Sequence, residues 1–202
     1  AALLERVGLV LLADRKTDFG PPRFLLATDA FGLVFESIRP ALDSAIAVLA
    51  ETLGPPHEMN LYSAETEAWM TSFRLLQGVE VWQSHGQWIR KNRPKFGPDI
   101  HDRFEWAASL DPEDVPTAQT IRTQVAKQLE NLLAKDGVLC IPSSPSIALP
   151  KNTSGEELEQ FRGRALALLC IAGLAGLPQV SLPLATFASC PLGISLIGPR
   201  DA

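Results

Sequence analysis

The sequence predicts an α/β fold around a mixed β-sheet, and two patterns in its second half carry this prediction. Helical and strand segments alternate there: a helix over 117–135, a strand over 138–141, a helix over 156–175, and strands over 179–182 and 192–197. Such alternation is typical of helices layered on a sheet. Only about nine residues join the last two strands, fewer than a parallel crossover needs, so this pair is expected to be antiparallel.

Apolar runs mark the expected strands. Residues 138–141 are apolar throughout, which indicates a strand inside a sheet. Residues 24–27 form a similar run. A further short strand is expected over 57–61. Pro183 is expected to end the strand that begins at Gln179, because proline cannot donate to a strand ladder.

Apolar residues that recur every three to four positions mark the expected helices. The segment 62–89 is the longest, and shorter helices are expected over 40–53 and 99–107. Ser154 and Glu157 resemble a capping box that starts the helix 156–175. Gly137 is expected to cap the helix that ends at Lys135. The four tryptophans are expected mainly in the core: Trp69, Trp82, Trp88 and Trp106.

Composition limits the classes of protein. The 202 residues are 46% apolar, which suits one domain over 1–202 with a real core and excludes disorder for most of it. The net charge of -5 and the lack of basic runs argue against nucleic-acid binding. No apolar run is long enough for a membrane span. We expect a cytoplasmic protein.

Metal and cofactor chemistry is not expected. Cys140, Cys170 and Cys190 form no CxxC pair and lie in apolar stretches, so they are interpreted as reduced, buried residues. The histidines His57 and His85 share no metal-ligand spacing with each other or with His101. No phosphate-binding glycine loop is present.

Ser143 and Ser144, at the end of the strand 138–141, are the candidates for chemistry. A nucleophilic serine needs a base and an oxyanion hole, and no GxSxG elbow surrounds them. Lys135 and Lys151 lie in contexts that do not look buried, which a catalytic lysine requires. A role in lining a pocket and a purely structural loop both stay open. The residues alone supply no self-sufficient catalytic set.

Three segments in the last third resemble the amidase signature family. Residues 136–150 (DGVLCIPSSPSIALP) are similar to its "apolar run-P-T-x-P-x-x-A-P" stretch. Residues 172–183 (AGLAGLPQVSLP) resemble its "aGlPaisvP" segment, and 191–199 (PLGISLIGP) its last apolar strand. Their order and spacing also agree. Residues 82–89 (WQSHGQWI) are similar to the plant branch, which includes indole-3-acetamide amidases and an amidase-like receptor of the chloroplast outer envelope.

The resemblance implies α/β/α layers around a mixed sheet and hydrolysis of an amide by a Ser–cis-Ser–Lys set without a cofactor. The Gly/Ser-rich signature and the lysine of the family have no counterpart here, so the chain resembles the carboxyl-side part of one domain. We expect a fragment or an excised domain without catalytic residues of its own. By position, five residues are expected to bind substrate: Pro142, Ser143, Ser144, Gln179 and Val180.

The expected partners are a small-molecule amide and the missing amino-side half of the domain, and a homodimer is left open. Three interpretations stay open at this stage. The parent is an enzyme, or it is a non-catalytic amidase-like receptor with a plastid association. In the third interpretation the chain is a separate α/β binding module.

Overall fold

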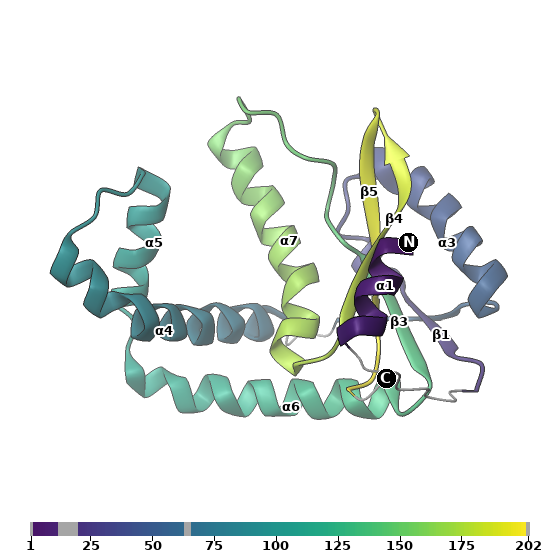
Figure 1. Cartoon of the computed structure of the whole chain (residues 1–202), viewed down its shortest axis with the longest axis horizontal. Helices are drawn as coiled ribbons and strands as arrows, with labels where there is room; N and C mark the ends of the chain where they lie inside the picture. The colour runs from purple at the N-terminus through teal and green to yellow at the C-terminus, as the bar shows by residue number, and fades with distance from the viewer. Residues whose placement is uncertain (1, 12–19, 63–65, 201–202) are drawn as a thin grey trace.

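The computed structural model describes residues 2–11, 20–62 and 66–200, and it has a mixed five-stranded sheet (Figure 1). The strand order is β2-β1-β3-β5-β4. The strands are β1 (Arg23–Ala27), β2 (His57–Met59), β3 (Gly137–Pro142), β4 (Gln179–Phe187) and β5 (Cys190–Ile197). β1 is parallel to β2 and β3, whereas β5 is antiparallel to β3 and β4. The antiparallel last pair is therefore confirmed.

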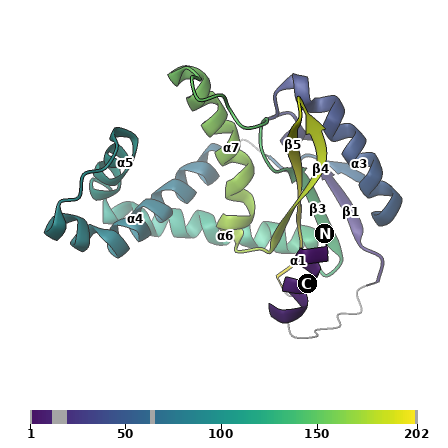
Figure 2. The same cartoon turned by 45° about the horizontal axis from the view of Figure 1, so that its top comes forward.

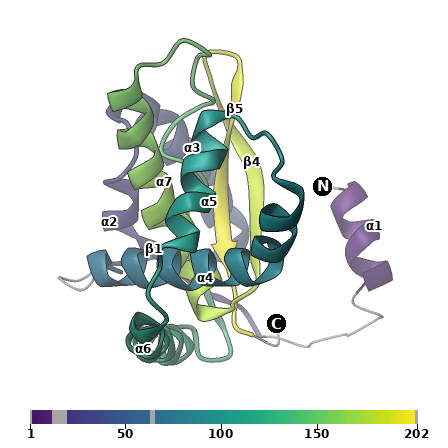
Figure 3. The same cartoon turned by 90° about the vertical axis from the view of Figure 1, so that its left-hand side faces the viewer.

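Helices cover both faces of this sheet, which confirms the predicted α/β/α layers. The α-helices are α1 (Ala2–Leu11), α2 (Thr28–Phe31), α3 (Arg39–Leu53), α4 (Thr66–Asn92), α5 (Pro98–Ala108), α6 (Val115–Leu133) and α7 (Gly155–Ala175). Two 3₁₀ turns, η1 (Glu36–Ile38) and η2 (Pro112–Asp114), precede α3 and α6. In Figures 1 and 3, α3 lies on one side of the sheet, and α6 and α7 on the other.

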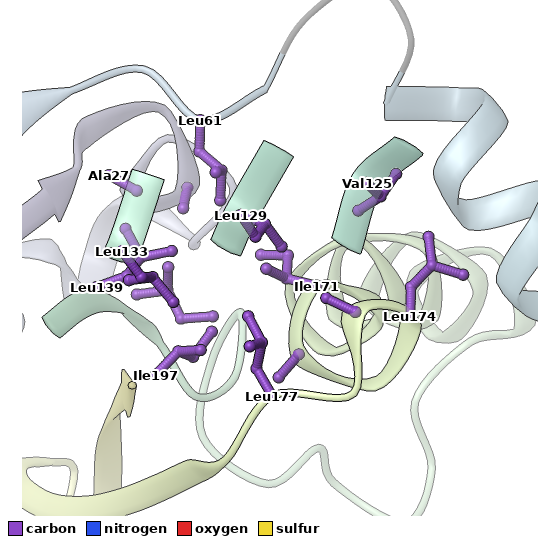
Figure 4. Packing of buried hydrophobic residues seen from close by; sticks show 14 of the residues in the cluster. Ala27, Leu61, Val125, Leu129, Leu133, Leu139, Ile171, Leu174, Leu177 and Ile197 are labelled. Carbon is purple, nitrogen blue, oxygen red and sulfur yellow. The ribbon is translucent and has the colours of Figure 1, made fainter. Parts of the chain in front are cut away.

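Two apolar clusters, one on each face of the sheet, form the core. The first joins β1, β3 and β5 to α6 and α7 through side chains such as Leu129, Leu139 and Ile171, all fully buried (Figure 4). The second packs α3 on the opposite face through Leu42, together with Cys140 from β3. Because side chains alternate along a strand, β1, β3 and β5 each contribute to both clusters.

Helices α4 and α5 form an arm that extends away from the sheet (Figure 2). Gly78 permits their close contact: a Cβ atom there would lie 2.6 Å from Leu110 and 2.7 Å from the Trp106 ring. At its inner end α4 crosses α7, where Phe73 lies against Gly173. Of the four tryptophans only Trp69 is in the core, since Trp88 is 54% exposed and Trp106 41% exposed. The core expectation is thus wrong for those two, because they lie on the arm.

The predicted start of α7 is confirmed, and the predicted end of α6 is wrong. Ser154 and Glu157 form a full capping box. Helix α6, however, ends at Leu133, followed by Ala134 at φ 50°. Gly137 is the first residue of β3, and a Cβ atom there would lie 2.6 Å from the Leu133 carbonyl oxygen. This glycine therefore provides room for the turn between helix and strand.

Pro183 does not end β4, contrary to expectation. The strand continues to Phe187, and its pairing with β5 shifts register between Leu182 and Ala185. β4 is at the edge of the sheet, and an edge strand with an irregularity is where proline is tolerated. The reversal into β5 falls at Ala188 and Ser189, both at positive φ.

The three cysteines are free: Cys140 and Cys170 are buried, whereas Cys190 is only partly buried, which corrects the expectation for that residue. Burial raises the pKa of Cys140 to about 12 and that of Cys170 to about 11. In the unfolded chain both thiols are exposed to water and have the ordinary pKa of 9.0, so they ionise above that pH. The folded state keeps these two protonated, so their contribution to stability is complete below that pH and is lost as pH rises towards 12.

We therefore expect the free energy of unfolding to fall as the pH rises above 9.0, measured by urea unfolding at a series of pH values. Replacement of both Cys140 and Cys170 by alanine should flatten this slope. An unchanged slope in the double variant would show that other groups cause it. In the native protein a thiol reagent should modify Cys190 first.

None of the helices in the described part of the chain is both long and apolar enough to cross a membrane.

Candidate functional site

Polar side chains from three neighbouring strands meet on one face of the sheet. Ser143, just after β3, has its Oγ 2.6 Å from Ser181 Oγ of β4 and 2.8 Å from Ser195 Oγ of β5. Gln179 Nε2, also in β4, donates to Ser195 Oγ over 2.8 Å. We call these four residues the hydroxyl cluster.

Strand alternation explains why these residues meet. Leu139 and Ile141 of β3 point into the α6–α7 core, so Ser143, two residues on, continues the same face. In β5, Ile197 points into that core, which places Ser195 on the same face. The register between β4 and β5 then determines which β4 residues lie on this face. Ser181 pairs with Ser195, and Gln179 pairs with Ile197. The cluster is the polar continuation of an otherwise apolar face.

Gly193 provides the space in which the hydroxyls meet. A Cβ atom at this position would lie 2.7 Å from Ser143 Oγ and 2.8 Å from Ser181 Oγ. Its carbonyl oxygen also accepts a hydrogen bond from the Ser143 N–H over 3.0 Å. A side chain at residue 193 would therefore push apart the contacts that hold the cluster.

The cluster extends from the core to the surface. Ser195 is 0% exposed and Ser143 is partly buried, whereas Ser181 and Gln179 are exposed. A buried hydroxyl costs free energy unless it is hydrogen bonded, and Ser195 has two such partners here. Ser195 is one of two buried polar residues recorded in the described chain.

The five residues expected to bind substrate do not share one surface. The structure brings Ser143 and Gln179 together in the cluster. Pro142 pairs with Ile194, and Val180 with Leu196, both residues that face the α3 cluster on the opposite side of the sheet. Ser144 closes a local turn by donating to the Ser146 carbonyl oxygen over 2.6 Å. Whether any of the five binds an amide stays a prediction.

Sequence reasoning missed Ser181, Ser195 and Gly193. A signal was present, because Gln179 and Ser181 are two residues apart in β4, as Gly193 and Ser195 are in β5. Small or polar residues at alternate positions of apolar strands indicate one non-core patch on a sheet face. The register that aligns the two strands is not visible in either strand alone.

The cluster lacks the groups that would make Ser143 a nucleophile. Over residues 2–11, 20–62 and 66–200, the recorded hydrogen bonds of its Oγ go only to serines, with no basic side chain. Its own N–H is already bonded to Gly193, so it is not free for an oxyanion hole. The described residues also contain no group of three or more His, Cys, Asp or Glu that could hold a metal.

A concave feature lies on the arm, away from the hydroxyl cluster. This cavity of about 260 Å³ is lined mainly by Trp82, Phe96, Phe104 and His101. The Trp82 indole lies over Gly86, and the Arg90 guanidinium is 5.1 Å from its ring centre. His101 Nε2 is 3.6 Å from a Glu105 oxygen, an exposed pair on α5. The lining comes from the arm alone, with no residue of the hydroxyl cluster.

Comparison with known proteins places these features in a family, although no protein-family model matches the chain. Amidase 1 of Arabidopsis thaliana is 30% identical over 97% of this chain, which corresponds to 53% of that protein. The chloroplastic outer envelope protein 64 of the same plant is 35% identical over 62% of this chain and 21% of its own length.

Solved structures agree in fold. A crystal structure of an amidase superimposes with a TM-score of 0.76 at 21% identity, covering 91% of this chain and 43% of the amidase. A bacterial aryl acylamidase of the amidase signature enzymes gives 0.65 at 19% identity, over 89% of this chain and 40% of that one. The chain belongs to the amidase signature family.

The family's three recognisable segments surround the hydroxyl cluster. Residues 136–150 supply β3 and Ser143, residues 172–183 supply the end of α7 and most of β4, and residues 191–199 supply β5. This amidase-family chain spans about half the length of Amidase 1, and less of the other relatives above.

Proposed function

We propose that residues 1–202 are the carboxyl-side part of a single amidase signature domain whose parent hydrolyses a carboxylic amide to an acid and ammonia or an amine. The observation that supports this most is the similarity to Amidase 1, which extends over 97% of the chain. That relative continues well beyond the matched region, since the chain spans 53% of it. We infer that the remainder is the amino-side half, which completes the domain.

In this proposal the catalytic residues lie in the amino-side half. A lysine, acting through a bridging serine in a cis peptide, takes the proton of a nucleophilic serine. That serine adds to the amide carbon, the lysine returns the proton to the amide nitrogen, and ammonia or an amine leaves as the C–N bond breaks. Water then hydrolyses the acyl-enzyme and the acid is released. No cofactor takes part.

The chain's own contribution is the sheet and one wall of the acyl pocket. Ser143, which is partly buried, and Gln179, which is exposed, contribute polar groups to this face of the sheet. Ser144 lies in the turn next to Ser143, and we place it at the rim. Pro142 and Val180, on the other face, support the strands from behind.

An aromatic acetamide such as indole-3-acetamide is the substrate class that likeness to the plant amidases favours. The amide and the amino-side half are the proposed partners, with a homodimer as the remaining candidate. We place the enzyme in the cytoplasm.

A non-catalytic amidase-like receptor is the second candidate, since outer envelope protein 64 is 35% identical over 62% of this chain. Such a protein would keep the fold for binding and would be associated with plastids. Both candidates share the strands described here.

The sequence upstream of Ala1 in the parent gene, followed by an assay of the full-length protein, separates the two. The enzyme proposal expects a lysine and a serine pair upstream, and release of ammonia from phenylacetamide or indole-3-acetamide that is lost when either group is replaced by alanine. A parent with both groups replaced and no turnover would reject the enzyme and favour the receptor.

A further inference from the structure

The hydrogen bonds of the hydroxyl cluster are compatible with one direction that starts at Gln179. Gln179 Nε2 donates to Ser195 Oγ, so one lone pair of this oxygen is occupied. Ser195 is 0% exposed, and in the described part of the chain its other hydrogen-bond partner is Ser143 Oγ. A buried hydroxyl proton needs an acceptor, so the Ser195 proton goes to Ser143.

The remaining bonds follow from this direction. A hydroxyl has a single proton. Because Ser143 Oγ accepts from Ser195, its own proton is available for Ser181 Oγ at 2.6 Å, and Ser143 is the donor of that bond in the proposed direction. The Ser181 oxygen is thereby an acceptor, and its own proton is left to point away from the chain. Ser181 is the exposed end of the series. Each bond in such a series polarises the next, which makes the terminal hydroxyl a stronger donor than an isolated serine.

We propose that the Ser181 hydroxyl binds a carbonyl or carboxylate oxygen of the small-molecule ligand, and that Gln179, Ser195 and Ser143 are positioning residues that fix it as a donor. This inference rests on the proposed function, because an amide substrate has such an oxygen at the bond to be broken and its acid product has two. Ser181 is placed for this role, because it is exposed on the edge strand β4 while its cluster partner Ser195 is buried.

The sharpest test reverses the direction of the bonds without removing Ser181. In Gln179→Glu the carboxylate only accepts, so Ser195 donates to it, Ser143 donates to Ser195, and Ser181 donates inwards to Ser143. Ser181 then presents a lone pair to the ligand instead of a proton. Thr186→Glu is the matched control, since it places the same charge at another exposed position of β4, five residues after Ser181.

The experiment measures kcat and KM for phenylacetamide, and its equilibrium binding by calorimetry, in the full-length protein. Ser181→Ala and Gln179→Glu should each weaken binding and raise KM about three- to tenfold, as expected for one hydrogen bond. Thr186→Glu should change either quantity less than twofold. Melting temperatures of the variants show whether the fold is intact.

The outcomes separate this inference from the proposed function. Binding of phenylacetamide that depends on Ser181, without turnover, would support the donor role and reject the amidase. Turnover with KM and binding unchanged in Ser181→Ala would leave the amidase standing and overturn the inference. Loss in Ser181→Ala but not in Gln179→Glu would overturn the directed series. A lower melting temperature of Ser181→Ala with unchanged KM would mean that the Ser181 hydroxyl donates to a main-chain carbonyl of the protein and not to the ligand. This result would also overturn the inference.

Discussion

Replacement of Ile171 by alanine should lower the free energy of unfolding by about 2–5 kcal/mol, because it removes a fully buried side chain where α7 meets the sheet. Ile171 packs among residues of α6, β3 and β5 (Figure 4), and a rigid site with neighbours from several elements cannot collapse around the cavity. Urea unfolding followed by circular dichroism measures the loss.

Leu169 provides the matched control. It lies on the same helix two residues earlier and is 50% exposed. Leu169→Ala should change the free energy of unfolding by less than about 0.5 kcal/mol. Equal losses in the two variants would mean that the packing of α7 differs from the structure described.

Replacement of Gly193 by alanine should cost about 1–3 kcal/mol, because the added methyl group overlaps atoms of Ser143 and Ser181 at 2.7–2.9 Å. The cost is steric, since Gly193 is not among the glycines with positive φ. The main-chain bond from Ser143 to Gly193 fixes the position of the Ser143 Cβ atom, which would lie 2.9 Å from the added methyl group and cannot rotate away. Urea unfolding, monitored by circular dichroism, measures this cost as well.

A double variant tests the stated cause of that loss. Ser143→Ala removes the atom that lies closest to the new methyl group, so Gly193→Ala combined with Ser143→Ala should cost less than the sum of the two single changes. Gly163→Ala, in α7 with nothing within 4 Å of its added Cβ, should be neutral or stabilising. Strict additivity of the two costs would contradict the contact.

Features encoded within a few residues could be predicted from the sequence. The helix periodicity of α6, the capping box of α7 and the short link between β4 and β5 each predicted the element that the structure contains. The predictions that Gly137 caps α6 and that Pro183 ends β4 were wrong, because the roles of these two residues depend on contacts outside their own segments. Gly137 avoids the Leu133 carbonyl, and Pro183 is accommodated at an irregular edge strand.

The candidate site was visible only in part, for the same reason. Ser143 stood out as a serine at a strand end, and the family resemblance singled out Gln179. Ser181 and Ser195 are 38 and 52 residues away from Ser143, and only strand order and register bring them within 2.6 and 2.8 Å of its hydroxyl. Gln179 and Val180 were both expected to bind substrate. They are adjacent in β4, however, and strand alternation puts adjacent residues on opposite faces of the sheet.

Hydrolysis of a simple aryl amide by the purified 202-residue chain is the most direct test of the central claim, that the reacting groups of the amidase lie outside it. We predict no release of ammonia or amine above the rate without protein, since the recorded bonds of Ser143 in the described chain include no base. Clear turnover that is lost in Ser143→Ala would contradict the claim and make this serine the nucleophile.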